Sequence, residues 1–134
     1  MDGQLEGIRW GRVVLAALLV EVLLGVVSAP LVFMTRDPGP ILNLTTPPAC
    51  FIIAALVVAL LFRRAARPVA NGVATGVVSI ALYVVLGVVA YFLAPDRTDF
   101  NQSLGVPYLA SHVLKVLGGA AGGYWIARRR ATAA

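Results

Sequence analysis

Four long apolar stretches dominate the pattern of hydrophobic and polar positions along the chain, and short polar or proline-rich segments separate them. About 20 apolar residues in a helix span the hydrocarbon core of a bilayer, and these stretches approach or exceed that length. The pattern therefore predicts an all-α fold, a four-transmembrane-helix bundle that forms a single integral membrane domain over residues 1–134. The expected helices cover residues of about 12–34, 47–63, 69–93 and 106–127.

Prolines and glycines set the expected ends of these helices. Residues 38–40, a proline-glycine-proline sequence, are expected to break any helix, so residues 35–48 are predicted to form a long loop. The two prolines at the end of that loop suit the first turn of the second helix. Pro68 marks a tight turn, and residues 95–105 are predicted to form the second long loop.

Basic residues gather at one end of the predicted helices. Only Arg36 and Arg97 fall at the other end. Because cytoplasmic loops carry an excess of lysine and arginine, this bias predicts that both the N and the C terminus are cytoplasmic. The residues on the cytoplasmic side are Arg9, Arg12, Arg63, Arg64, Arg67, Arg128, Arg129 and Arg130.

Composition agrees with a membrane protein, because 60% of the residues are hydrophobic, 13% are charged and the mean hydropathy is +0.88. The net charge of +5 does not indicate nucleic acid, since the arginines lie beside apolar spans rather than in a basic stripe. The expected partners are the lipid bilayer and, as a possibility, a second copy of the chain or another membrane protein. The abundance of arginine, alanine, valine and glycine suggests a bacterial cytoplasmic membrane.

A carboxylate, Glu21, lies near the middle of the first apolar stretch. A charge at the centre of a membrane helix costs roughly 2.5 to 3.5 kcal/mol on insertion scales, so Glu21 is expected to have a partner or a function. The cationic candidate is Lys115 in the fourth stretch. Glu21 lies twelve residues after Arg9, and Lys115 lies thirteen residues before Arg128. At ~1.5 Å per residue, the two side chains are expected at nearly the same depth.

Small residues form stripes on three of the predicted helices. They share a face with Glu21 in the first helix, with Tyr83 in the third and with Lys115 in the fourth. Small residues let helix backbones approach closely, so these stripes are expected to meet inside the bundle. The glycines expected at the contacts are Gly25, Gly72, Gly76, Gly87, Gly119 and Gly122. The second helix has almost no polar side chains and is expected in a more lipid-exposed position.

The polar side chains on these faces predict one intramembrane cluster. Tyr83 is expected to donate a hydrogen bond to a buried pair of Glu21 and Lys115, and pairing offsets much of the desolvation cost. His112 lies one turn outward of Lys115, where a histidine either relays protons or simply bonds a neighbouring helix. The expected members of the cluster are Glu21, Ser79, Tyr83, Ser111, His112 and Lys115.

The sequence contains no evident nucleophile-base arrangement, no phosphate-binding glycine loop after a strand and no histidine pair for haem. An enzyme is therefore the least favoured class, and no cofactor or metal is expected. The favoured function is that of a non-enzymatic accessory or structural membrane protein, in which Glu21 and Lys115 lock the helix register. The alternative is a small proton- or ion-coupled transporter or channel component that uses Glu21, Tyr83 and Lys115.

Overall fold

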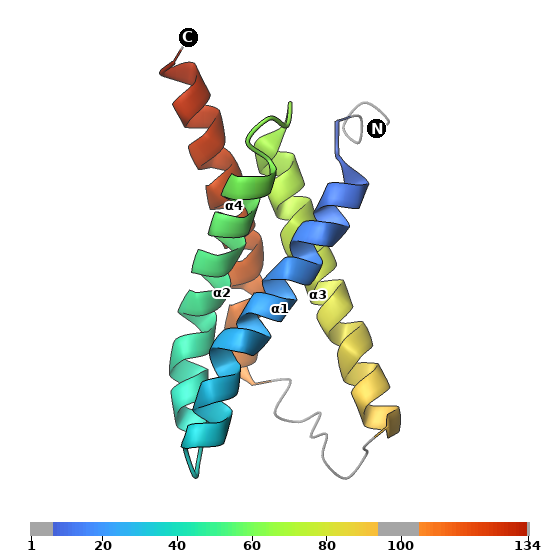
Figure 1. Ribbon diagram of the computed structural model, residues 1–134, viewed down its shortest axis with the longest axis vertical. Coiled ribbons are helices and arrows are strands. Elements are labelled where there is room, and N and C mark those ends of the chain that lie inside the picture. The colour runs from blue at the N-terminus through green and yellow to red at the C-terminus, as the bar shows by residue number, and fades with distance from the viewer. Residues whose placement is uncertain (1–6, 94–104, 134) are drawn as a thin grey trace.

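The computed structural model describes residues 7–93 and 105–133 and is helical throughout its regular elements. The helices are α1 (Trp10–Met34), α2 (Gly39–Leu61), α3 (Pro68–Leu93) and α4 (Val106–Ala131), arranged as a bundle (Figure 1). The beginning of α1 and the end of α4 lie at the same end of the bundle (Figure 1). The predicted all-α class is confirmed.

Three helices, α1, α2 and α3, are long and apolar enough to cross a membrane. Their apolar runs leave many large side chains exposed, as expected for surfaces that face lipid rather than water. α4 is of similar length but less apolar, because it carries Lys115, several glycines and three arginines in its last turn. Basic side chains in that position interact favourably with the negative end of the helix dipole, which suits the extension of α4 through Ala131.

The predicted start of the second helix was wrong. α2 begins at Gly39, eight residues before the expected boundary, and only residues 35–38 connect it to α1. Pro40 occupies the first turn, where the missing N–H is not needed, while Pro47 and Pro48 lie inside the helix. Membrane helices tolerate interior prolines because neighbouring groups satisfy the freed carbonyls. Most of the second predicted loop, residues 95–104, lies outside the described residues.

The half of the bundle near the termini is packed backbone against backbone. A Cβ atom added to Gly119 would lie 2.2 Å from the carbonyl oxygen of Gly72 in α3. Cβ atoms added to Gly118 and Gly122 would each lie 2.3 Å from a carbonyl oxygen of α2, those of Phe51 and Ala55. α4 therefore sits in direct backbone contact with both α2 and α3.

The expectation of a more lipid-exposed position for the second helix was also wrong. Cys50, Ala54 and Val58 of α2 are buried, and the glycines of α4 press against this face. The apolar part of α2, residues 49–61, enters the core because its small residues let the glycine-rich α4 approach closely.

Polar contacts also join the helices at the end of the bundle where α1 begins and α4 ends, and the sequence did not predict these contacts. Asn71 of α3 accepts a 2.9 Å hydrogen bond from the backbone N–H of Arg9 and donates to the carbonyl of Gly7, which ties the start of α1 to α3. The Arg130 guanidinium donates to the carbonyls of Ala65 and Arg63, which fastens the end of α4 to the turn after α2.

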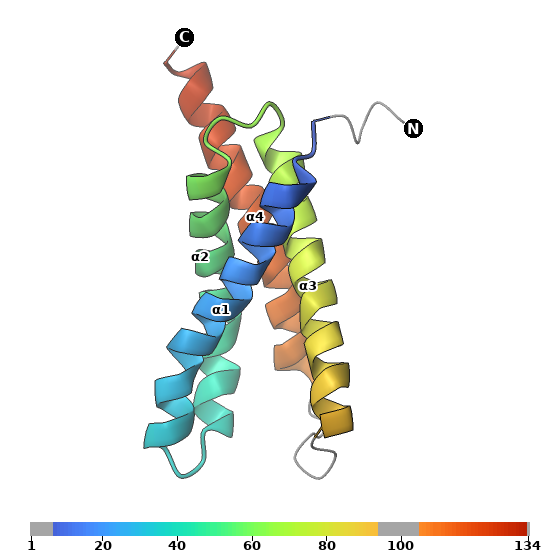
Figure 2. The ribbon, with the colours of Figure 1, turned by 45° about the vertical axis from the view of Figure 1, so that its right-hand side comes forward.

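The opposite half of the bundle is open. α1 and α3 separate toward this end in both side views (Figure 1, Figure 2). A Cβ atom added to Gly25 or Gly87 would meet no neighbouring heavy atom within 4 Å. The packing role expected for these two glycines is therefore not found among the described residues, because their helices have already diverged where the glycines lie.

Candidate functional site

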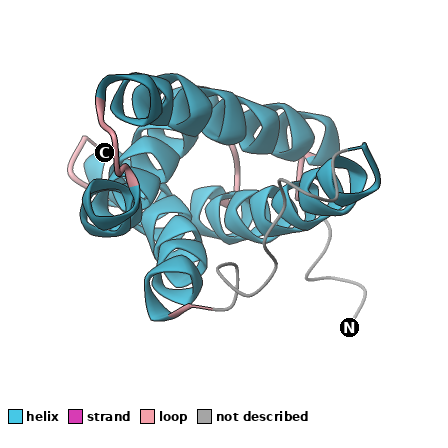
Figure 3. Cartoon of the chain, turned by 90° about the horizontal axis from the view of Figure 1, so that it is seen from below, coloured by secondary structure: helices cyan, strands magenta, loops and turns pink. Residues whose placement is uncertain are grey.

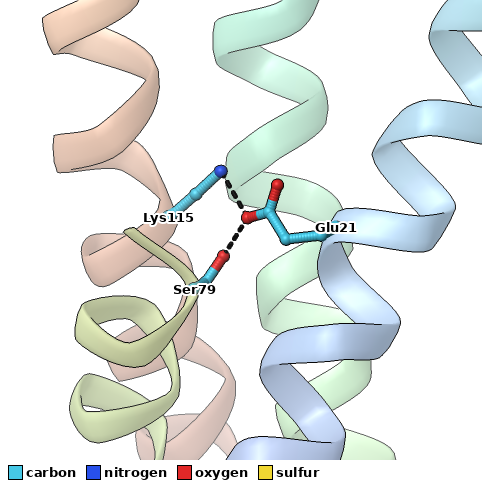
Figure 4. A network of polar contacts seen from close by, with 3 residues as sticks. All are labelled: Glu21, Ser79 and Lys115. Carbon is cyan, nitrogen blue, oxygen red and sulfur yellow. Dashed lines mark hydrogen bonds and ion pairs between the residues drawn. The ribbon is translucent and has the colours of Figure 1, made fainter. Parts of the chain in front are cut away.

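The candidate site forms where three helices bring polar side chains together at the middle of the bundle. Lys115 of α4 donates a 2.6 Å hydrogen bond from Nζ to Oε1 of Glu21 in α1, and the hydroxyl of Ser79 in α3 donates to the same oxygen (Figure 4). The Lys115 side chain is 3% exposed and the Glu21 side chain 13%. The pair thus joins the first and fourth helices, and Ser79 adds the third.

Because the contact between Glu21 and Lys115 is buried, it is important for the stability of the fold. Ser79 is fully buried, and apolar residues of α1 next to Glu21, Val20 and Ala17, are also fully buried. In such surroundings a single charge is costly, whereas a charge-assisted hydrogen bond between opposite charges is stronger than a neutral one. The arrangement therefore balances both charges locally and leaves neither without a partner.

The hydrogen bond expected from Tyr83 comes from Ser79 instead. Tyr83 contacts Lys115 through its ring, whose centroid lies 5.2 Å from Nζ, in the geometry of a cation-π interaction. Ser79 and Tyr83 are four residues apart on one helical face, so the sequence placed both near the pair. The sequence alone did not indicate which of the two hydroxyl groups reaches Glu21.

An aromatic group lies beside the pair. The rings of Tyr83, Tyr108 and His112 meet edge to face, with centroids 4.5 to 5.2 Å apart. The Nδ1 atom of His112 is buried and has no hydrogen-bond partner among the described residues. Tyr108 lies near the start of α4, and its ring contributes to this group.

Ser111 lies near the pair but bonds elsewhere. Its hydroxyl donates a 2.8 Å hydrogen bond to the carbonyl of Pro107 in its own helix, a common arrangement for serine in membrane helices. Of the six residues expected in the cluster, the structure therefore brings Glu21, Ser79 and Lys115 into one hydrogen-bonded group. The tyrosine and histidine rings flank that group.

A cavity of about 680 Å³ leads to this group from the open half of the bundle. Residues of all four helices line its wall, and Figure 3 shows the arrangement of these helices seen from below. Glu21 and Lys115 lie where the cavity meets the close-packed half, so they form its floor. The polar residues of the wall are Glu21, Ser28, Asn43, Thr46, Tyr83, Tyr108, Ser111, His112 and Lys115.

The chemistry of this cavity suits the binding of a small polar molecule. Its volume falls within the range of roughly 300 to 1,000 Å³ found for ligand pockets, and Glu21, Tyr83 and Lys115 lie together at its inner end. No group of three or more histidine, cysteine, aspartate or glutamate side chains that could hold a metal occurs within residues 7–93 and 105–133.

Comparison with known proteins adds no family to this picture. No protein-family model matches the chain, and no curated protein and no solved structure is significantly similar to it.

Proposed function

We propose that the protein is a polytopic membrane protein that takes a small polar solute or ion from one side of the membrane to the Glu21–Lys115 pair, as a transporter or a transport component. The observation that supports this proposal is the cavity lined by all four helices, which ends on the pair. A pair that served only to hold helices together would need no cavity leading to it. An intramembrane carboxylate with access to solvent is a common feature of ion and proton pathways.

We also propose that α4 is a fourth membrane span. Its polar and glycine side, which includes Ser111, Lys115 and Gly119, is buried against the other helices. Its opposite side presents the exposed apolar residues Leu109 and Val113, with Leu117 one turn further on. A helix with this division satisfies its polar groups inside the bundle and offers an apolar surface to lipid.

The orientation follows from the arginines. Eight of them lie at the end of the bundle that carries the termini, which favours a cytoplasmic position for that end. The close-packed half then faces the cytoplasm and the cavity opens to the outside. In a bacterium this membrane is the cytoplasmic membrane.

A structural role is the second candidate, and the low exposure of Lys115 favours it. At 3% exposure, with its ammonium bonded to Glu21, Lys115 satisfies the requirements of a lock between α1 and α4. In this role the chain is an accessory membrane protein, and its exposed apolar faces meet lipid, a second copy or another membrane protein. In a transporter, Glu21 must exchange Lys115 for a proton or another ligand, whereas in a structural role Glu21 stays bonded to Lys115.

Replacing Ser79 by alanine is expected to separate the two roles. The variant removes the hydroxyl that donates to the Glu21 carboxylate, with a stability loss of about 1.5 to 3 kcal/mol for one hydrogen bond to a charged group, which is less than the loss expected for breaking the ion pair. Transport predicts a changed rate of proton flux into vesicles that contain a pH-sensitive dye and carry a potassium diffusion potential. The thermal midpoint of the protein should fall by several degrees, but the variant should remain folded at the temperature of the assay.

Thr45→Ala is the matched control, because it also removes one hydroxyl, but this hydroxyl donates to the carbonyl of Ile41 in its own helix and Thr45 lies outside the cavity wall. Its proton flux should equal that of the original protein. If the flux of Ser79→Ala also stays unchanged, or falls only in proportion to the amount of folded protein, the pair takes no part in proton transport and the structural role is favoured.

A further inference from the structure

A second pocket, of about 330 Å³, lies at the opposite end of the bundle, where α2 ends beside the last turns of α4. Three of the residues that line it are arginines, Arg63, Arg129 and Arg130, and no described residue in its wall is acidic. Three guanidinium groups around one hollow repel one another unless an anion lies between them. The pocket is therefore electrostatically suited to a negatively charged ligand.

The three arginines are held in different ways. The Arg130 guanidinium is fixed by its hydrogen bonds to the carbonyls of Ala65 and Arg63. The Arg129 guanidinium stacks over the ring of Trp125, with Cζ 3.9 Å from the ring centroid. No hydrogen bond or ion pair engages the Arg63 side chain within the described part of the chain. Two charges are thus preorganised at the pocket, and a third is available to close on a ligand.

The surroundings of these charges favour a lipid. Trp125 is 47% exposed, and tryptophan concentrates where membrane helices meet the headgroup region. The apolar side chains of Ala59 and Ile126, both buried, line the inner part of the same pocket. A ligand that fits has an anionic head for the arginines and an apolar part that continues along the protein surface.

We infer that this pocket binds the phosphate-ester headgroup of an anionic phospholipid. The guanidinium groups of Arg63 and Arg129 bind the phosphate oxygens, the bound Arg130 adds positive charge, and the first carbons of the lipid lie against Trp125. Basic pockets of this kind between membrane helices are suited to anionic headgroups on the cytoplasmic side. The inference does not depend on the role of the cavity at the other end.

The sequence supplies a direct probe. The chain has two tryptophans, so Trp10→Phe leaves Trp125, which lines the pocket, as the single reporter. The variant is reconstituted in phosphatidylcholine vesicles that contain increasing fractions of phosphatidylglycerol with brominated acyl chains. Quenching of Trp125 fluorescence gives the binding of the anionic lipid relative to that of brominated phosphatidylcholine. Each variant is normalised to its own unquenched intensity.

Two neighbouring arginines outside the pocket serve as matched controls. Arg64→Gln and Arg128→Gln remove the same charge at the same end of the bundle as Arg63→Gln and Arg129→Gln. The general attraction of the protein to an anionic surface falls equally in both members of each pair. The preference for phosphatidylglycerol should therefore fall roughly tenfold further in the pocket variants, as expected for a lost charge-assisted hydrogen bond.

Three results would overturn the inference. In the first, quenching by the anionic lipid equals that by phosphatidylcholine. In the second, each pocket variant behaves as its neighbouring control. In the third, millimolar inorganic phosphate displaces the brominated phosphatidylglycerol, which would assign the pocket to a soluble anion rather than to a lipid. A preference for the anionic lipid that depends on Arg63 and Arg129 and resists phosphate supports it.

Discussion

Glu21→Gln is expected to lower the free energy of unfolding by about 3 to 5 kcal/mol, the penalty for breaking a buried ion pair from one side. The glutamine oxygen can still accept from Ser79, but the ammonium of Lys115, 3% exposed, loses its counter-charge. Titration of the detergent-solubilised protein with a denaturing detergent, followed by circular dichroism, measures this loss. Asp37→Asn, at an exposed carboxylate between α1 and α2, should leave stability unchanged.

Removal of the other partner, by Lys115→Met, is expected to lower the free energy of unfolding by less than Glu21→Gln does. It leaves Glu21 unpaired, but Glu21 faces the cavity and is 13% exposed, so water can solvate part of its charge. The double variant should recover part of the loss, because neither charge then remains. Additive losses in a double-mutant cycle would rule out the coupling between the two side chains.

Gly119→Ala is expected to have the next largest effect on stability. Its Cβ would lie 2.2 Å from the carbonyl oxygen of Gly72, and a backbone atom cannot turn aside as a flexible side chain does. Overpacking of this kind costs typically 1 to 3 kcal/mol, occasionally more, because α3 and α4 have to separate. The same denaturation experiment measures the loss.

Gly25→Ala is the matched control for this prediction, since a Cβ there meets no neighbouring heavy atom within 4 Å. Alanine is the better helix former by about 1 kcal/mol, so this variant should be neutral or slightly more stable. Equal losses of stability in Gly25→Ala and Gly119→Ala would mean that the two positions are packed alike. This result would contradict the division of the bundle into an open half and a close-packed half.

The helical architecture could be predicted from the sequence because length and hydropathy of the apolar stretches determine it. The residues of the pair could be proposed for the same reason, since few ionisable side chains lie at membrane depth and Glu21 and Lys115 share one level. The start of α2 could not be predicted, because interior prolines that break a water-exposed helix are tolerated in a membrane helix.

Tertiary packing accounts for the other differences. Glycine stripes indicate that backbones meet, but not which partner they meet, and α4 proved to contact α2 as well as α3. The divergence of α1 and α3, which leaves Gly25 and Gly87 on the cavity wall, has no signal in the composition of either helix. Whether Ser79 or Tyr83 donates the hydrogen bond to Glu21 depends on how closely α1 and α3 approach at that level, and the sequence does not determine this distance.

The proposed transport role requires that water enters the cavity from the outside on the way to the Glu21–Lys115 pair. Impermeant thiol labelling of Gly87→Cys in a Cys50→Ala background tests it most directly, because Gly87 lines the cavity and has room for a side chain. Val85→Cys on the same helix is the control, since Val85 lies outside the cavity wall and is 57% exposed on the apolar surface of the bundle.

Two further cysteines fix the sides of the membrane, Asp37→Cys at the α1–α2 connection and Arg64→Cys in the turn after α2. The proposal predicts that sealed cells are labelled from outside at Asp37→Cys and Gly87→Cys, whereas Val85→Cys stays unlabelled and Arg64→Cys reacts only after permeabilisation. If Gly87→Cys stays as unreactive as Val85→Cys, or reacts only together with Arg64→Cys, no outward-open water path reaches the pair and the proposed transport site is contradicted.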